Sequence, residues 1–205
     1  MKVDYLLHQT HIENLRSILT KGLKMSLKSE SIVDMDGDLE RFIWFDFIGR
    51  VKDDIVYSNT GFVTASRGIT IVLDFQKILD KVRQSGGLFS LKFVSDYVKF
   101  ESNTQGITMW DSETSPNVEI PDRVARAVEC VIATDDVDKT LNQYLYRKSD
   151  REEILFKVTD CITKFVVCQE LEDKLNVLLR MLGLTRRIPV VVHRGLSRDE
   201  MLSII

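Results

Sequence analysis

The chain has 205 residues, of which 44% are hydrophobic and 29% are charged, and its formal net charge is −3. A chain of this size buries roughly 70% of its unfolded surface when it folds, so we expect a single domain over residues 1–205. The slightly acidic balance argues against a globally basic nucleic-acid binder but leaves a local basic groove open.

Membrane and secretory signals are missing from the sequence. No apolar run approaches the roughly 18 residues that a membrane span needs, and charges at Lys2 and Asp4 come too early for a secretory signal. The three cysteines form no C-x-x-C pair. We therefore expect a cytoplasmic protein with reduced cysteines, no structural metal and no membrane partner.

The first predicted elements are a strand and a helix. The apolar run Val3–His8 predicts a strand that leads directly into the helix. Thr10 and Glu13 fit a capping box in which Thr10 is the N-cap residue. Gly22 ends the predicted helix.

Between residues 39 and 55, apolar residues recur every four positions, a spacing that we interpret as one buried face of a helix. These residues are Leu39, Ile43, Phe47, Val51 and Ile55.

Apolar runs predict further strands at residues 61–66, 70–75, 88–93, 97–101, 128–133, 162–168 and 188–192. Helical spacing predicts helices at residues 77–84, 137–146, 170–182 and 199–205. The polar stretch 102–122 predicts a long loop, which inside a compact domain is usually functional or disordered. Because strands and helices do not alternate strictly, we expect an α+β fold.

The turn from the first strand into its helix is the first candidate site. His8 and Thr10 share one side of an extended segment, and the free amides of the helix start suit a carboxamide or a phosphate. Gln9 and Asn14 flank this position. Plain capping by Thr10 and a structural histidine are the alternative.

Arg67 is the second candidate, in a Thr-Ala-Ser-Arg-Gly segment between two predicted strands. A guanidinium at this place can offer a bidentate fork to a pyrophosphate. A solvated turn arginine explains the same pattern.

Glu129 is the third candidate because it interrupts the apolar strand Val128–Ala133. Burying a carboxylate there without a partner would cost roughly several kcal/mol of folding free energy. Glu129 therefore lies on a wet face, pairs with a cation such as Arg67, or lines a cleft. An acid that protects an edge strand from aggregation is the alternative.

Taken in order, these segments resemble the ADP-ribosyltransferase superfamily, especially its DarT-type and related small phage and bacterial members. The opening block 6–23 has a histidine and a threonine before an N-L-x-x-I-L-x-x-G-L helix. The block 62–74 is similar to the S-x-T-R segment and the following strand of the related group, and 126–132 is similar to the glutamate-bearing strand. Residues 188–192 resemble the strand after the last long helix.

The resemblance implies a split mixed-sheet sandwich with surrounding helices, and NAD as co-substrate in the cleft between two small sheets. It assigns catalysis to Glu129 and Arg67 and acceptor contact to Trp110 in the loop 102–122. The cofactor-binding residues that it implies are His8, Gln9, Thr10, Asn14, Ser66 and Arg67. Ala127 stands where the arginine-modifying branch carries a second acid or amide, so classical modification of protein arginine is not expected.

The function that follows is an NAD-dependent ADP-ribosyltransferase acting on a macromolecule, either a nucleobase in DNA or a protein side chain. Such a chain fits a toxin or effector, for which an antitoxin or other inhibitor is a candidate partner. Two alternatives stay open. One is an RNA 2′-phosphotransferase-like enzyme, whose phosphate grips would be Arg67, Arg186 and Arg187. The other is a non-catalytic module on the same fold that binds a nucleotide or a protein.

Overall fold

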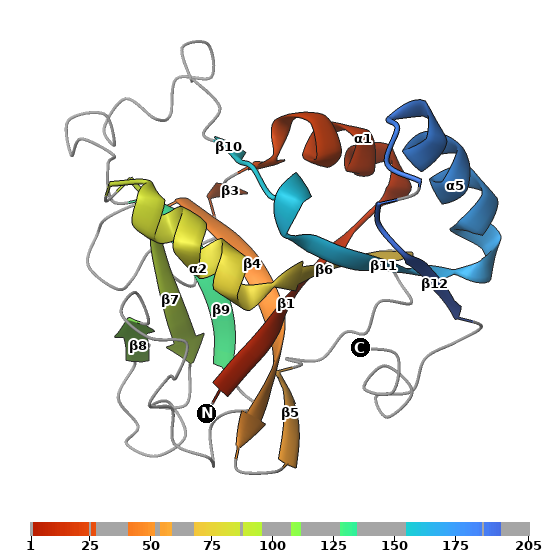
Figure 1. Ribbon diagram of the computed structural model, residues 1–205. Coiled ribbons are helices and arrows are strands. Elements are labelled where there is room, and N and C mark those ends of the chain that lie inside the picture. The colour runs from red at the N-terminus through yellow and green to blue at the C-terminus, as the bar shows by residue number, and fades with distance from the viewer. Residues whose placement is uncertain are drawn as a thin grey trace.

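Figure 1 shows a computed structural model of the chain, which describes residues 2–24, 26–27, 41–51, 54–58, 68–86, 88–95, 108–111, 128–134, 155–185 and 187–193. Its three α-helices within these ranges are α1 (Ile12–Lys21), α2 (Phe75–Gln84) and α5 (Glu172–Met181). The strands are β1 (Lys2–Thr10), β2 (Leu23–Lys24), β3 (Ser26–Leu27), β4 (Arg41–Val51), β5 (Asp54–Ser58), β6 (Ile69–Asp74), β7 (Ser90–Ser95), β8 (Thr108–Asp111), β9 (Val128–Thr134), β10 (Leu155–Phe156), β11 (Ile162–Cys168) and β12 (Val190–His193).

The helix ends follow from local chemistry. The Asp74 side chain accepts a hydrogen bond of 3.0 Å from the Lys77 amide, and this bond caps α2. Gly22 ends α1 with φ of 120°, and a Cβ atom at this position would overlap the Phe156 carbonyl. Only glycine therefore fits between α1 and the segment that carries Phe156.

Ten of the described strands belong to one sheet in the order β12-β11-β6-β1-β4-β9-β7-β8, with β3 and β5 also paired to β4. The pairing of β11 with β12 is parallel, and the pairs from β11 to β8 are antiparallel. The fold is therefore α+β with a mixed sheet.

The long strand β4 joins two halves of this sheet. Residues Arg41–Phe45 pair with β9, whereas residues Asp46–Arg50 pair with β1. The sheet therefore splits along β4, and Figure 1 shows β1 and β9 diverging on either side of the split.

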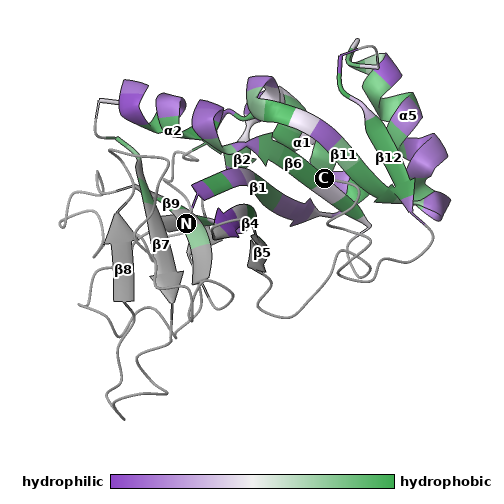
Figure 2. Cartoon of the chain, turned by 60° about the horizontal axis from the view of Figure 1, so that its bottom comes forward, coloured by the Kyte–Doolittle hydropathy of each residue, from purple (hydrophilic) through white to green (hydrophobic). Residues whose placement is uncertain are grey.

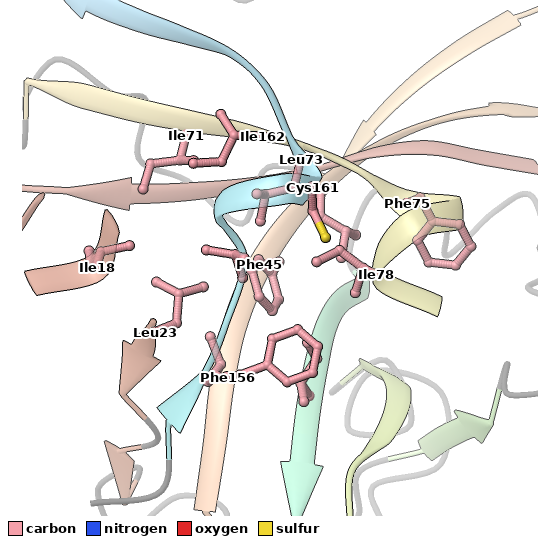
Figure 3. Close-up of a cluster of buried hydrophobic side chains, with 14 of the residues drawn as sticks. Ile18, Leu23, Phe45, Ile71, Leu73, Phe75, Ile78, Phe156, Cys161 and Ile162 are labelled. Carbon is pink, nitrogen blue, oxygen red and sulfur yellow. The ribbon is translucent and has the colours of Figure 1, made fainter. Parts of the chain in front are cut away.

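The main hydrophobic core covers one face of both halves. It joins β-strand side chains such as Leu6, Phe45 and Phe165 to residues of the three helices. Figure 3 shows Phe45, Phe156, Cys161 and Ile78 meeting in this core. We call this side the core face. In Figure 2, hydrophobic colour runs along β6 and most of β11, and hydrophilic colour marks the outer sides of α2 and α5.

The opposite face of the central strands is the second face. It holds a smaller buried cluster of Leu7, Ile48, Val72 and Val166, against which Tyr5 and Val191 pack. The central strands β1, β6 and β11 are thus buried on both faces, which explains why their sequences are nearly continuous apolar runs.

Two predictions from the sequence are wrong. The helix predicted over residues 39–55 is wrong, because Arg41–Val51 and Asp54–Ser58 are the antiparallel strands β4 and β5. Thr10 is not the N-cap of α1: it is the last residue of β1 and pairs with Ile69, so the N-cap is His11, without a side-chain cap bond.

The other element predictions within the described ranges are confirmed with small shifts: the first strand and helix, β6, α2, β7, β9, β11, α5 and β12. The predicted loop 102–122 contains strand β8, so Trp110 lies in a strand. The strands predicted at 61–66 and 97–101, and the helices predicted at 137–146 and 199–205, lie outside the described residues.

Candidate functional site

The split of the sheet along β4 is the place where the predicted site residues approach one another. Phe45 pairs with Cys130 of β9, and the next residue, Asp46, pairs with Leu7 of β1. Glu129 and His8 each follow directly on these pairs, one on β9 and one on β1. The backbone positions of His8 and Glu129 therefore flank the same two residues of β4.

His8 bridges the opening between β1 and β4. Its Nδ1 lies 3.3 Å from the Trp44 carbonyl oxygen, and its ring meets the Phe45 ring edge-on at 5.8 Å. Because a carbonyl oxygen only accepts hydrogen bonds, Nδ1 carries the hydrogen, and Nε2 is an acceptor when the ring is neutral. The contact of the His8 side chain with Trp44 therefore links β1 to β4 just beyond the last backbone pair of these two strands.

Gln9 lies on the other side of β1. Its Nε2 donates to Asp46 Oδ2 at 3.3 Å, across the same strand pair. Leu7, its neighbour on that face, belongs to the second-face cluster, whereas Leu6 belongs to the main core. Gln9 and Asp46 therefore form a polar pair on the second face, next to the split.

The four cofactor-binding residues predicted in the opening block do not share one surface. Thr10, which is 4% exposed, alternates with Gln9 and shares the core side of β1 with His8. Its hydroxyl makes a long 3.5 Å contact with the His11 carbonyl oxygen. Asn14 lies on the exposed side of the first turn of α1. His8 and Thr10 therefore lie on the core side of β1, Gln9 lies on the second face, and Asn14 lies apart from all three on α1.

Glu129 and Trp110 are described through their backbone register. Glu129 pairs with Val94 of β7. Trp110 pairs with Phe93, which pairs with Cys130, which in turn pairs with Phe45. Trp110 thus lies in the same cross-strand row as the split, three strands from β4 and about 14 Å away at the usual strand spacing.

Arg67 and Ser66 lie outside the described residues, but their neighbour Gly68 is described. Gly68 is buried with φ of 81°, and a Cβ atom there would overlap the Leu171 side chain. Its carbonyl accepts a 3.1 Å hydrogen bond from the Cys168 amide. The start of β6 is therefore held closely against the end of β11.

Sequence reasoning missed three polar residues near the split: Trp44, Asp46 and Thr70. Asp46 interrupts the apolar run Phe42–Ile48, which is the same signal that singled out Glu129. Thr70 interrupts the run Ile69–Leu73 in the same way. Both could have been found by asking why a strand that is otherwise fully apolar carries one polar residue.

The cysteines near the site are not activated. Burial raises the pKa of the Cys130 thiol well above its ordinary value. Burial and a hydrogen bond to the Glu170 carboxylate raise the pKa of Cys168. Both thiols stay protonated at neutral pH, which argues against either as a nucleophile.

The described ranges also lack two other classes of feature. No group of three His, Cys, Asp or Glu side chains lies close enough there to hold a metal ion. None of the described helices is long and apolar enough to cross a membrane.

No protein-family model and no curated protein matches the sequence. In structure the chain is similar to DarT from Thermus sp. 2.9 in complex with NAD+, with a TM-score of 0.44 and 14% identity over 93% of this chain and 96% of that chain. The complex of that DarT with ADP-ribosylated ssDNA gives a TM-score of 0.45 and 14% identity over 95% of this chain and 98% of that chain. The complex of that DarT with carba-NAD+ gives a TM-score of 0.43 and 13% identity over 93% of this chain and 96% of that chain.

Proposed function

We propose that the protein is an NAD-dependent ADP-ribosyltransferase, formed by residues 1–205 as one domain, that transfers ADP-ribose to a macromolecule. The observation that carries the proposal is the change of partner along β4, which brings the backbone positions of His8 and Glu129 to the same two residues, Phe45 and Asp46. Two segments that resemble the family's active-site blocks, with His8 and Glu129 121 positions apart in sequence, thus flank one split of the sheet.

In this proposal NAD binds along the split, with its nicotinamide ribose beside Glu129. Cleavage of the bond between ribose C1′ and nicotinamide leaves positive oxocarbenium character on the ribose, and nicotinamide departs with the bonding electron pair. The ionised Glu129 carboxylate stabilises this charge. The acceptor atom then bonds to C1′ and gives its proton to Glu129 as general base.

The other residues at the split hold the substrate. The His8 ring, fixed by its contacts to Trp44 and Phe45, cannot rotate freely, so a group bound to its Nε2 is held in one direction. The Gln9–Asp46 pair adds an amide and a carboxylate on the second face. Arg67 is proposed as the pyrophosphate grip and Trp110 as the acceptor contact, as the sequence resemblance implies.

The test uses NAD labelled in its adenylate half. The wild-type protein is incubated with a pool of single-stranded oligonucleotides and, separately, with denatured and native cell proteins, while transferred label and released nicotinamide are measured. Label on the oligonucleotides identifies a nucleobase acceptor, and label on proteins identifies a side chain.

Glu129→Gln keeps the size of the side chain and removes its charge. We expect it to lower transfer by about 100-fold or more, the order of effect seen when one transition-state contact is lost, with the Kd for NAD changed by less than about threefold. Glu172→Gln on α5 is the matched control and should transfer as the wild type does. Wild-type transfer that survives Glu129→Gln would remove Glu129 from the mechanism.

Two other outcomes would replace the proposal. If NAD raises the melting temperature but neither transfer nor nicotinamide release occurs, the protein is a nucleotide-binding module. Removal of a 2′-phosphate from an RNA substrate, with NAD as acceptor, would identify it as a phosphotransferase.

A further inference from the structure

Helix α5 carries an apolar patch on the side that faces away from the core. Its buried residues are Leu175 and Leu179, which belong to the main core cluster. Val177 and Met181 lie one turn apart and are 53% and 68% exposed, the highest values among the large hydrophobic side chains that the structure describes. A single exposed apolar residue is ordinary, but two at this spacing on one helix form a continuous contact surface.

Charged residues border this patch in a regular order. A helix turns by about 100° per residue, so Val177 lies nearly opposite to the middle of the buried side. Asp173 and Arg180 then lie on one side of Val177, and Lys174 and Met181 lie on the other. Asp173 comes two turns before Arg180, about 10 Å along the helix axis. An acidic and a basic residue thus stand in line at nearly equal distances before and after the middle of the patch.

We propose that α5 pairs with α5 of a second copy of the chain, antiparallel and about a two-fold axis beside Val177. The Val177 side chains of the two copies then meet at the centre. Asp173 of each copy faces Arg180 of the other, because a two-fold axis perpendicular to both helices reverses the height along the helix and keeps the side. Met181 of each copy packs beside the aliphatic stem of Lys174 of the other.

The order of the charges selects the antiparallel pairing. A parallel pair would set Asp173 against Asp173 and Arg180 against Arg180, and such like-charge contacts are unfavourable. The antiparallel pair also places the positive N-terminal end of each helix dipole beside the negative C-terminal end of the other. The surface is therefore complementary to itself, as a two-fold contact between identical chains requires.

The place of α5 in the molecule suits such a contact. Figures 1 and 2 both show α5 at one end of the molecule, beside β12. β12 is four strands from β4 in the order of the sheet, about 19 Å at the usual strand spacing, so the contact lies away from the split. One helix on another buries less surface than most stable dimers do. We therefore expect an equilibrium between monomer and dimer that depends on protein and salt concentration.

The experiment is sedimentation equilibrium at low salt, from about 10 µM to about 1 mM protein, the range in which a weak dimer forms. The wild-type mass should rise toward that of a dimer across this range. Asp173→Arg and Arg180→Asp should each raise the dissociation constant by about tenfold or more, because the two-fold axis makes every substitution act twice. An equal mixture of the two variants should associate as the wild type does, since each supplies the charge that the other lacks.

Val177→Glu tests the apolar centre of the contact. It sets two carboxylates against each other at the two-fold axis, so this variant should stay monomeric over the whole range. Ile55→Glu on β5 is the matched control, because Ile55 is 49% exposed and lies on another element. It should associate as the wild type does. Both substitutions change exposed side chains, so the melting temperature in dilute solution should stay near the wild-type value.

Three results would overturn the proposal. One is a wild type that stays monomeric up to about 1 mM, and another is a dimer that Val177→Glu leaves intact. The third is a mixture of Asp173→Arg and Arg180→Asp that associates no better than either variant alone, since the helices would then not be antiparallel. The proposed function would stand in all three cases, because its residues lie at the split.

Discussion

The two faces of the central strands differ in what they bury. The core face joins β1, β6 and β11 to all three described α-helices through a large cluster of apolar side chains. Among the described residues, the second face has a smaller cluster of four buried apolar side chains, and beside them lie the Gln9–Asp46 pair and Thr70. The first arrangement stabilises the fold, whereas the second sets polar side chains beside buried apolar ones, which costs stability wherever a polar atom lacks a partner.

The largest expected effect tests the core face. Phe165→Ala removes a fully buried ring from β11 and should lower the free energy of unfolding by about 3–5 kcal/mol. Urea denaturation measures this loss. The NAD affinity of the protein that remains folded should be unchanged, because Phe165 faces away from the second face; a large change in Kd would mean that the two faces are not separate in function.

Gln9→Ala tests the second face. Loss of the Gln9–Asp46 hydrogen bond should cost about 1 kcal/mol of stability and weaken NAD binding by roughly tenfold. Gln76→Ala is the control, because Gln76 makes the same kind of bond to Asp80, at 2.9 Å, on the exposed side of α2. Equal NAD affinities for the two variants would exclude Gln9 from the binding surface.

The smallest expected effect concerns the attachment of α2 to the core side of the molecule. Lys81 Nζ lies 2.9 Å from Asp160 Oδ2, and the Asp160 side chain is 70% exposed. Partial burial disfavours the charged form of Asp160, but the hydrogen bond from Lys81 and the charges of Lys81 and Lys77 outweigh it and lower the pKa.

A lowered pKa in the folded state stabilises the protein above the unfolded pKa of about 4, and this stability is lost as the pH falls through the folded value. The free energy of unfolding of the wild type should exceed that of Asp160→Asn by less than about 1 kcal/mol at pH 7, because exposed ion pairs are weak. The difference should disappear near pH 2 in urea denaturation. A difference that persists there would assign the effect to packing rather than charge.

Much of the fold could be predicted because runs such as Ile69–Leu73 and Ile162–Cys168 are apolar, β-branched and bounded by turns. The error at residues 39–55 has a simple cause. A spacing of four residues fits a helix face, but four is also a multiple of two, so the same residues share one face of a strand. The aromatic residues Phe42, Trp44 and Phe45 favour a strand and should have decided the matter.

The candidate site was less predictable. The sequence pointed to His8 and Glu129 separately, but their meeting depends on where β4 changes partner, and no local pattern encodes that position. Thr10 was misassigned because its pairing with Ile69 extends β1 by two residues beyond the predicted end and moves the cap to His11. Asp46 and Thr70 each interrupt an apolar run, but only the strand order shows that both lie on the same face of the strands that flank β1.

The position of β11 also bears on how the chain can be shortened. β11 comes late in the sequence, yet it covers one side of β6, whose other side pairs with β1. A fragment that stops before residue 155 would leave Ile69–Asp74 as an open edge, with unpaired backbone groups beside a hydrophobic, β-branched segment. Such an edge invites pairing with other chains, so truncated forms should aggregate, and the last quarter of the chain protects the solubility of the first half.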